Sequence, residues 1–532
     1  SRLYIAIPHA FQSFYHILTM CVLYKPTFFL LLAALWVMQA QAQVTQIGGD
    51  ISLPSHLLAA DRFGERIALS GDGQRIAIAA PEYDSARGAV VLYEYNGTDW
   101  QLLDTLFGAQ TGERFGAQVD LSHNGRTLAV SSPDFDGFNG ADAGRVQIFT
   151  NGFPATTYGS VFDLEGGQSG CHFGAGLALG SDGRRFVVGA PNYRDTRLAP
   201  LAAEGIAYLY KCNDVMTVCQ LERTFTGQTN GVLVGESVAI SADSANILIS
   251  GGVDHGFVDS TGRTSGARLY QLNTSTNFWE WRQNIYTTML GEEFGRSLAV
   301  SNVAVFDTIN LPTVLIGAPA GNVANQQSGS IYITNFGDGT RIENQLRGRA
   351  FGDRFGNAVD ISADGQQVIV GAPMCDDLAS NGGEWRIYSL VGNAWQQTHT
   401  QSGLTANGEC GAAVSSSESG SRVAVSCAAA GVVRAYEVTP VSVAEIAPLP
   451  TALYSPNPAT MQVQAQFAQP LPAAATLRIV DATGREVLRQ QLTAQSTAAD
   501  IDCSTLPQGL YFVQVLSAQG AALVQTAKLT KI

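Results

Sequence analysis

The chain has 532 residues, a formal net charge of −14, and charged side chains at only 14% of its positions. This charge balance offers no basic face for the phosphates of a nucleic acid, so we expect no nucleic-acid partner. The length suits several domains, or one repeat array with an appendage. With 56 glycines and many short β-branched runs, the composition favours an all-β fold rich in turns.

The first recognisable segment is a signal peptide at residues 20–42. Lys25 supplies a positive charge, the apolar run FFLLLAALWVM follows at 28–38, and small residues lead up to Ala42. This order predicts secretion with cleavage after Ala42, and it makes residues 1–19 an upstream extension. No later stretch reaches the apolar length of a membrane-spanning helix, so we expect a mature chain without a transmembrane segment, outside the cell or on its outer surface.

From residue 61 onward the chain repeats one pattern. The stretch DRFGERIALSGDGQRIAIAAP at 61–81 returns as ERFGAQVDLSHNGRTLAVSSP at 113–133 and as DRFGNAVDISADGQQVIVGAP at 353–373. Two degenerate copies surround Gly235 and Gly411. The seven copies lie 52 to 61 residues apart, and a period of this length is typical of a repeat architecture. Five copies carry a Phe-Gly pair: Phe63-Gly64, Phe115-Gly116, Phe173-Gly174, Phe294-Gly295 and Phe355-Gly356.

Each copy predicts four antiparallel strands. A short alternating run follows Phe-Gly, then an Asp-Gly or Asn-Gly turn, and then a dense apolar run that ends in proline. A third strand such as GAVVLYEY and a more polar fourth strand complete the copy. Four strands repeated seven times predict a seven-bladed β-propeller over residues 43–440. The last copy has only three clear strands, so we expect the N-terminal strand at 44–53 to complete its blade and close the ring.

The Phe-Gly and Gly-Ala-Pro pattern resembles the FG-GAP repeats of integrin α-chain propellers and their bacterial relatives. It carries Gly-Ala-Pro at 189–191, 317–319 and 371–373. In integrin-type repeats the turn between the first two strands often holds calcium through a string of acids. Here the equivalent turns carry one acid or none, at Asp72, Asn124, Asp182, Asp243 and Asp364, so calcium is possible but not expected.

One further oxygen-rich loop is the weak alternative for a metal site. It contains Asp134, Asp136, Asn139 and Asp142, whose spacing is not that of an EF-hand. We interpret it as a solvated glycine-rich loop, and we expect neither a metal nor another cofactor.

Seven cysteines follow the signal peptide. Cys212 and Cys219 flank a short loop, which predicts a disulfide across a hairpin in an oxidising compartment. The spacing predicts no zinc site, because no second pair of Cys or His accompanies them. The sequence leaves open how the other five pair: Cys171, Cys375, Cys410, Cys427 and Cys503.

The loops offer candidate ligand-binding residues, because repeats keep their scaffold and vary at the binding face. No Gly-x-Ser-x-Gly elbow, His-Glu-x-x-His helix or phosphate-binding loop is present. We therefore expect a non-catalytic protein that binds an extracellular glycan or protein; the alternatives are a structural coat protein and, less favoured, a propeller hydrolase or lyase with its site in the loops at the channel mouth. The candidate loop residues are Arg194, Asp195, Asp254, His255, Asp376 and Asp377.

The composition turns to proline and alanine at 441–452, as in a linker. Alternating runs and tight turns at 453–532 then predict a small immunoglobulin-like β-sandwich. This segment resembles the type A C-terminal sorting domain of the type IX secretion system in Bacteroidetes, which implies the secretion machinery as a partner; an ordinary immunoglobulin-like binding module is the alternative. The matching residues are Asn457, Pro458, Gly484, Gly509 in LPQGLYFVQV, and Lys528.

Overall fold

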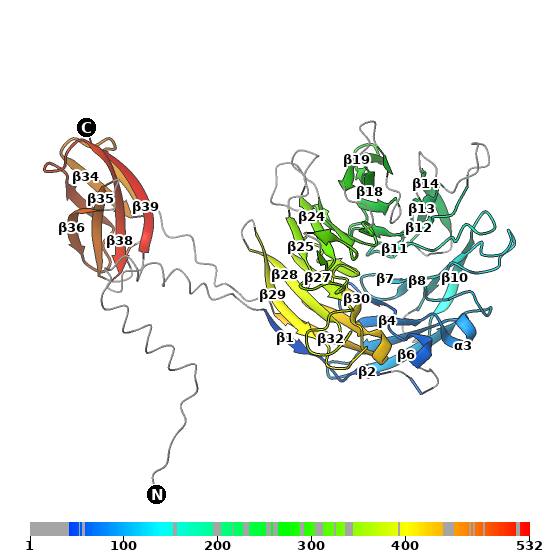
Figure 1. Cartoon of the computed structure of the whole chain (residues 1–532). Helices are drawn as coiled ribbons and strands as arrows, with labels where there is room; N and C mark the ends of the chain where they lie inside the picture. Colours follow the sequence, from blue (N-terminus) through cyan, green and yellow to red (C-terminus); the bar gives the residue numbers. More distant parts are fainter. Residues whose placement is uncertain are drawn as a thin grey trace, which may run out of the picture. The chain divides into compact units, whose positions relative to one another are not determined.

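The computed structural model describes residues 42–439 and 452–531 apart from short internal stretches. These stretches are 53, 56–58, 153–156, 195–203, 215, 217, 227–232, 252–256, 259–263, 288–291, 304–311, 324–325, 336–343, 392–393, 468–469, 472–473, 482–484 and 518–521. The chain divides into two compact units, Ser1–Pro440 and Val441–Ile532 (Figure 1). Among the described residues, no helix is long and apolar enough to cross a bilayer.

The first unit is built from antiparallel sheets of at least four strands, which we number as blades in chain order. Blade 1 contains β3 Arg66–Leu69, β4 Arg75–Ala80, β5 Ala89–Tyr95 and β6 Trp100–Phe107. Blade 2 contains β7 Val119–Leu121, β8 Thr127–Ser132, β9 Arg145–Thr150 and β10 Gly159–Glu165. Blade 3 contains β11 Leu177–Leu179, β12 Arg185–Ala190, β13 Ile206–Cys212 and β14 Cys219–Thr226. Blade 4 contains β15 Val238–Ile240, β16 Asn246–Ser250, β17 Phe257–Val258, β18 Thr264–Asn273 and β19 Phe278–Thr287.

The remaining three blades follow the same order. Blade 5 contains β20 Ser297–Val303, β21 Pro312–Ala318, β24 Ser330–Asn335 and β25 Asn344–Arg347, with a small hairpin of β22 Asn322–Val323 and β23 Gln326–Gln327 beside it in sequence. Blade 6 contains β26 Ala358–Ile361, β27 Gln367–Ala372, β28 Glu384–Val391 and β29 Ala394–Ser402. Blade 7 joins β30 Cys410–Ser416, β31 Arg422–Cys427 and β32 Val432–Thr439 to β1 Gln43–Gln46 and β2 Ile51–Ser52. The helical turns are η2 Ala59–Asp61, α3 Tyr83–Ala86 and η3 Ala428–Ala430.

The innermost strands contact one another in a closed order, β3 with β7, β7 with β11, and so on to β30 with β3. This closed order makes the unit a seven-bladed propeller around a central channel. The prediction of an all-β propeller followed by a small β domain is therefore confirmed. The core lies between the blades: Ala77 and Val90 of blade 1 pack with Phe115 and Leu128 of blade 2, and all four side chains are fully buried.

The backbone repeats as closely as the sequence, including in the degenerate copies. The residue at the position before each Phe-Gly has a left-handed conformation in every blade, with φ between 48° and 57°. Few non-glycine residues adopt this conformation, so its recurrence marks one shared turn. These residues are Arg62, Arg114, His172, Leu233, Glu293, Arg354 and Glu409.

The N-terminal segment pairs with the last blade in two pieces. Val44 in β1 lies opposite Val438 of β32, and Ile51 in β2 lies opposite Val433. The sequence predicted one strand over 44–53, whereas the structure interrupts it at Gly48, whose φ of 69° is incompatible with a regular strand.

The turns between the first two strands of the blades also form a closed ring. Each turn donates a hydrogen bond to the turn of the next blade, and blade 7 donates back to blade 1. The ring therefore joins all seven blades at the end of the channel opposite the Phe-Gly residues. The bonds run from Asp72 N to His123 O, His123 N to Ser181 O, Ser181 N to Ala242 O, Asp243 N to Asn302 Oδ1, Asn302 N to Ala363 O, Ala363 N to Glu418 O, and Glu418 N to Gly71 O.

Two disulfides are present among the described residues. Cys212 and Cys219 join β13 to β14, as the sequence predicted. Cys410 and Cys427 join β30 to β31, and Cys410 occupies the position of the phenylalanine in other copies. The remaining cysteines among the described residues are buried thiols at Cys171, Cys375 and Cys503.

Removal of the Cys410–Cys427 disulfide should destabilise the propeller clearly. The bond closes a loop with a sequence separation of 17 residues, for which the loss of chain-entropy restriction alone costs about 3 kcal/mol. The double variant Cys410→Ala/Cys427→Ala should therefore unfold at a lower denaturant concentration than the wild type. Cys212→Ala/Cys219→Ala is the matched control, with a separation of only 7 residues and a smaller expected loss. Equal midpoints for wild type and the Cys410 variant would contradict this role.

The second unit is a small two-sheet β-sandwich. One sheet contains β33 Ala452–Ser455, β34 Gln462–Phe467 and β37 Ala498–Asp502. The other contains β36 Glu486–Leu492, β35 Ala475–Asp481, β38 Gly509–Ser517 and β39 Ala522–Lys531. Alternating residues from both sheets, such as Val463, Ile501, Leu477 and Val513, form one core between them.

Candidate functional site

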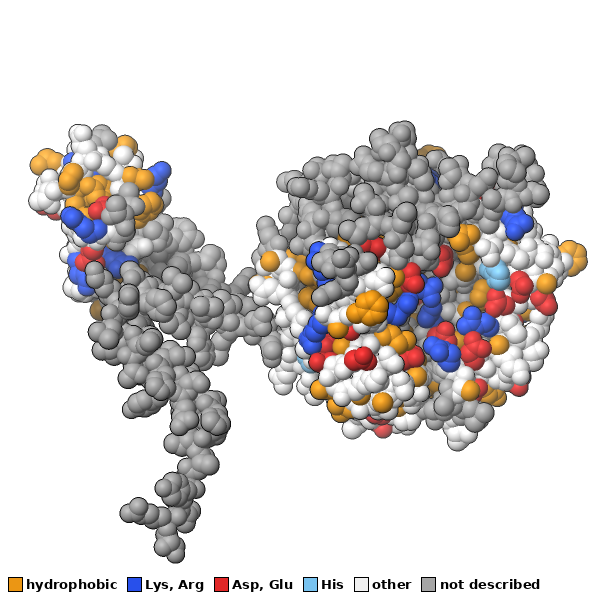
Figure 2. Space-filling view, viewed as in Figure 1, with side chains coloured by type: hydrophobic (Ala, Val, Ile, Leu, Met, Phe, Trp, Pro, Cys, Tyr) orange, Lys and Arg blue, Asp and Glu red, His pale blue; other side chains and the backbone are white. Residues whose placement is uncertain are grey.

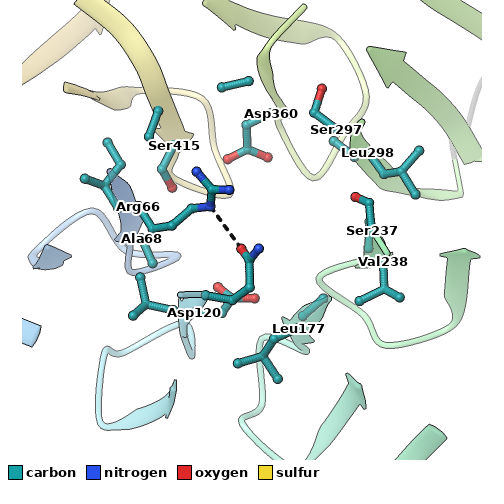
Figure 3. A pocket seen from close by; sticks show the side chains of 18 of the residues that line it. Arg66, Ala68, Asp120, Leu177, Ser237, Val238, Ser297, Leu298, Asp360 and Ser415 are labelled. Atoms are coloured by element: carbon teal, nitrogen blue, oxygen red, sulfur yellow. Dashed lines mark hydrogen bonds between the residues drawn. The ribbon is translucent and has the colours of Figure 1, made fainter. Parts of the chain in front are cut away.

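The central channel of the propeller forms a cavity. It has a volume of about 600 Å³ and is lined by the inner strands of all seven blades (Figure 3). This volume is within the range of small-molecule binding sites. Since blades pack through the faces of their sheets, the side chains at the channel edge are free to differ between copies.

One repeat position places polar groups in the channel. The fourth residue after the glycine of Phe-Gly is alanine in four blades, and Asp120, Asp360 and Ser415 replace it in three others. The alanines are Ala68, Ala178, Ala239 and Ala299. Figure 3 shows Asp120 and Asp360 on different sides of the channel.

Each of these three side chains accepts a hydrogen bond from the inner strand of the next blade. Leu179 N donates to Asp120 Oδ2 over 2.7 Å, and Ser416 N donates to Asp360 Oδ2 over 2.7 Å. Ser415 Oγ accepts from Leu69 N over 3.0 Å. These side chains therefore connect neighbouring blades, and they also satisfy backbone groups at the edge of the channel.

Burial opposes ionisation of the two channel carboxyls. It raises the pKa of Asp120 to about 7 and the pKa of Asp360 to about 6, against the opposing effect of the backbone N–H donors. The negative charge of Asp360 adds to the increase at Asp120.

The propeller should lose stability as pH rises from about 4 to 7. Because the pKa values of Asp120 and Asp360 are raised in the folded protein, the folded state holds more protons in this range, and stability falls as they dissociate. At about 1.4 kcal/mol per pKa unit, the combined loss for the two carboxyls over this range is on the order of 7 kcal/mol. We expect the melting temperature to fall between pH 5 and pH 8, with a smaller slope in Asp120→Asn/Asp360→Asn. An unchanged slope in that variant would contradict the assignment.

Arg66 lies at the Phe-Gly mouth of the channel. Its Nε donates to Gln118 Oε1 over 3.3 Å, and its Nη1 donates to the carbonyl oxygen of Glu65 over 2.9 Å (Figure 3). Within the described part of the chain, no carboxylate forms an ion pair with its guanidinium. Burial is the largest factor that lowers the pKa of Arg66; the negative charge of Glu65 opposes this effect, and the nearby Arg296 and Arg114 add to it.

Ion pairs surround this mouth. Arg354 pairs with Glu293 at 2.7 Å, and Arg114 pairs with Glu82 at 3.0 Å. The other pairs are Arg62 with Glu65 and Glu409, Arg114 with Glu65, and Arg296 with Glu236. Figure 2 shows acidic and basic side chains intermingled on this part of the surface. Exposed pairs of this kind add little stability, so the rim is mainly a polar surface that a ligand would meet.

A different arrangement occurs at the opposite end of the channel. Glu418 Oε2 lies 3.0 Å from His123 Nδ1, and its Oε1 accepts a hydrogen bond from Ser181 Oγ. The carboxylate thus lies between the hydroxyl and the imidazole, an order unlike that of a nucleophile activated by a histidine base. In the described residues no hydroxyl or thiol is hydrogen-bonded to a histidine.

Of the loop residues proposed from sequence, the three that the structure describes do not line the channel. Asp376 Oδ1 accepts from Asn381 N over 2.6 Å, and Asp377 Oδ2 accepts from Ser402 Oγ over 2.9 Å. Both aspartates are exposed, as is Arg194, whose backbone is bonded to Gln168. The other three candidates, Asp195, Asp254 and His255, lie outside the described residues.

The side chains of the oxygen-rich loop in blade 2 each contact a different partner. Asp134 Oδ1 lies 3.0 Å from His172 Nδ1, and this contact raises the pKa of His172. Asp136 Oδ1 accepts from Asp142 N over 3.0 Å, while Asn139 Nδ2 donates to a backbone carbonyl. No group of three or more His, Cys, Asp or Glu side chains in the described residues is arranged to hold a metal ion.

Sequence reasoning missed Arg66, Asp120 and Asp360 as candidate site residues. An alignment of the seven copies would have singled them out, because a charged residue replaces the small or apolar residue typical of the position. That alignment alone could not say that the two aspartates face a common cavity.

In the C-terminal sandwich, Asn457 fixes the final strand. Its Nδ2 donates to Lys528 O over 2.8 Å, and its Oδ1 accepts from Thr530 N over 3.0 Å. Gly509 begins β38 opposite Lys531, the Lys528 side chain is exposed, and Pro458 directly follows Asn457. Gly484 lies outside the described residues.

Residues 453–529 match the family model described as the secretion system C-terminal sorting domain. The match supports export through the type IX secretion system to the cell surface or the extracellular space, and it implies an interaction with that machinery. No curated protein matches the chain.

Proposed function

We propose that the propeller is the exported, non-catalytic binding part of this protein, and that its ligand enters the channel at the Phe-Gly mouth. The supporting observation is a cavity of about 600 Å³ with a charged rim. It lies in a ring that is closed by contacts between the inner strands of all neighbouring blades. A ring closed in this way is preorganised, so little conformational entropy is lost when a ligand binds.

A binding role also agrees with the chemistry of the channel. Ser181 is separated from His123 by the carboxylate of Glu418, and the carboxyls of Asp120 and Asp360 accept hydrogen bonds from backbone N–H groups. Hydroxyl and carboxyl groups in this arrangement can form hydrogen bonds with a hydroxylated ligand, whereas activation of a nucleophile requires a base that contacts it directly. The FG-GAP resemblance is compatible with adhesion but does not identify a ligand.

A screen of the purified full chain against glycans and matrix proteins tests this function. We expect saturable binding to at least one ligand, unchanged by a calcium chelator, because no described cluster suits a metal. Binding that is lost with the chelator would contradict the metal-free site. A complete absence of binding would contradict the proposal and favour a structural role, and turnover of a ligand would contradict the non-catalytic assignment.

A further inference from the structure

Arg66 is a cation inside the cavity that forms no ion pair among the described residues; the Glu65 carboxylate attracts it but pairs with Arg62 and Arg114. The other charged arginines at this mouth are each within ion-pair distance of a glutamate, as Arg296 is with Glu236 at 3.4 Å. Removing an unpaired charge from bulk water is costly, and an anion supplied by a ligand would offset that cost.

The free edge of the guanidinium suits one carboxylate. Nε and Nη1 are engaged by Gln118 and by the backbone of Glu65. Nη2 has no hydrogen-bond partner in the described part of the chain, so the Nη1–Nη2 edge can donate two parallel hydrogen bonds. A planar carboxylate accepts such a pair in bidentate geometry.

The surroundings suit hydroxyl groups rather than further charges. Ser237 and Ser297 come from blades 4 and 5, and Figure 3 shows both among the side chains that line the channel together with Arg66. Ser297 Oγ donates to Gly356 O over 2.8 Å, which leaves its oxygen as an acceptor. A ligand hydroxyl can therefore donate to Ser297 Oγ, and the hydroxyl of Ser237 can act as donor or acceptor.

The overall charge restricts the ligand to few anionic groups. The chain carries a net charge of −14, which repels a polyanion at long range. The channel carboxyls of Asp120 and Asp360 add negative charge when they ionise. A ligand with one carboxylate on a hydroxylated body is favoured over an extended polyacid.

We propose that the Phe-Gly mouth of the channel binds a sugar acid, with the uronate carboxylate on Arg66 and the hydroxyls on the serines of blades 4 and 5. This inference rests on the proposed function and deepens it by naming the ligand class and the residue that recognises the charge. It predicts discrimination between a uronic acid and the corresponding neutral sugar.

Titration of the full chain with D-glucuronate and D-glucose tests the proposal, with binding followed by calorimetry or ligand-observed NMR. Glucuronate should bind about tenfold or more tightly than glucose, because a charge-assisted hydrogen-bonded pair contributes about 1.5–3 kcal/mol. Arg66→Gln should remove this preference, and Arg66→Lys should restore part of it. Arg282→Gln is the control, since Arg282 lies on β19 and pairs with Glu280 at 3.3 Å.

The outcomes separate the ligand class from the general binding role. Equal affinity for the two sugars, no binding of either, or a preference that survives in Arg66→Gln would overturn the sugar-acid assignment. If another ligand from the screen still binds saturably, the binding function stands while this assignment fails. A parallel titration with a polyuronate tests the charge argument: weaker binding per residue than for free glucuronate is expected for a monomeric or terminal sugar acid, and tighter binding would overturn the preference for a single carboxylate.

Discussion

Gly88→Ala should destabilise the propeller by about 3–5 kcal/mol, whereas Gly112→Ala should cost about 1–2 kcal/mol. The two glycines have almost the same φ, 85° and 84°, in the region that non-glycine residues rarely adopt. A Cβ on Gly88 would lie 2.1 Å from the backbone oxygen of Phe115 in the next blade, while a Cβ on Gly112 would have nothing within 4 Å. The difference between the variants therefore measures contact between blades, with backbone strain held constant.

Chemical denaturation of the two variants and the wild type gives this difference directly. The same approach of a glycine to the next blade recurs at Gly144, Gly329 and Gly383, so the contact is a general feature of the ring. Equal losses in Gly88→Ala and Gly112→Ala would mean that the blades separate easily at this point, contrary to the packing described above.

Deletion of residues 43–52 should prevent cooperative folding of the propeller. These residues supply the outer strands of blade 7 and cover β32, which would otherwise present an open edge. They also carry Asp50, whose carboxylate pairs with Arg434 at 2.7 Å. We expect aggregation, or a broad unfolding transition by circular dichroism in place of a sharp one.

A rearranged chain provides the matched control for this deletion. Gln43 lies opposite Thr439 in the antiparallel pair, so a short turn can connect residue 439 to a relocated copy of residues 43–52. This variant should recover a sharp transition because it restores the same strand pairs. A fully folded deletion variant, or failure of the rearranged chain to recover, would contradict closure through the N-terminal strands.

The blade pattern could be predicted from sequence because its signals are local. Asp-Gly turns, a proline after the second strand and a period of 52–61 residues describe each copy without knowledge of its neighbours. The Cys212–Cys219 bond was predictable for the same reason. The Cys410–Cys427 pair was not, since it depends on a cysteine at the phenylalanine position lying beside the second strand.

The candidate site was harder to predict because it depends on how distant copies converge. Asp120 and Asp360 lie 240 positions apart in the chain but line one cavity. Conversely, Asp376 and Asp377 are adjacent, exposed and non-repeated, yet Asp376 bonds within its own loop, Asp377 bonds to Ser402 at the end of β29, and neither lines the channel. Sequence position indicates which residues vary between blades, and only the closed ring determines which of them meet.

The most direct test of binding in the channel is to block its mouth. Ser237→Trp places a large side chain in the cavity, whereas Ser160→Trp places the same side chain on an exposed outer strand. For the strongest ligand found in the screen, affinities of both variants should be compared with the wild type after confirming that their melting temperatures agree. Binding in the channel predicts loss of affinity in Ser237→Trp alone; unchanged affinity in that variant would place the ligand elsewhere on the protein.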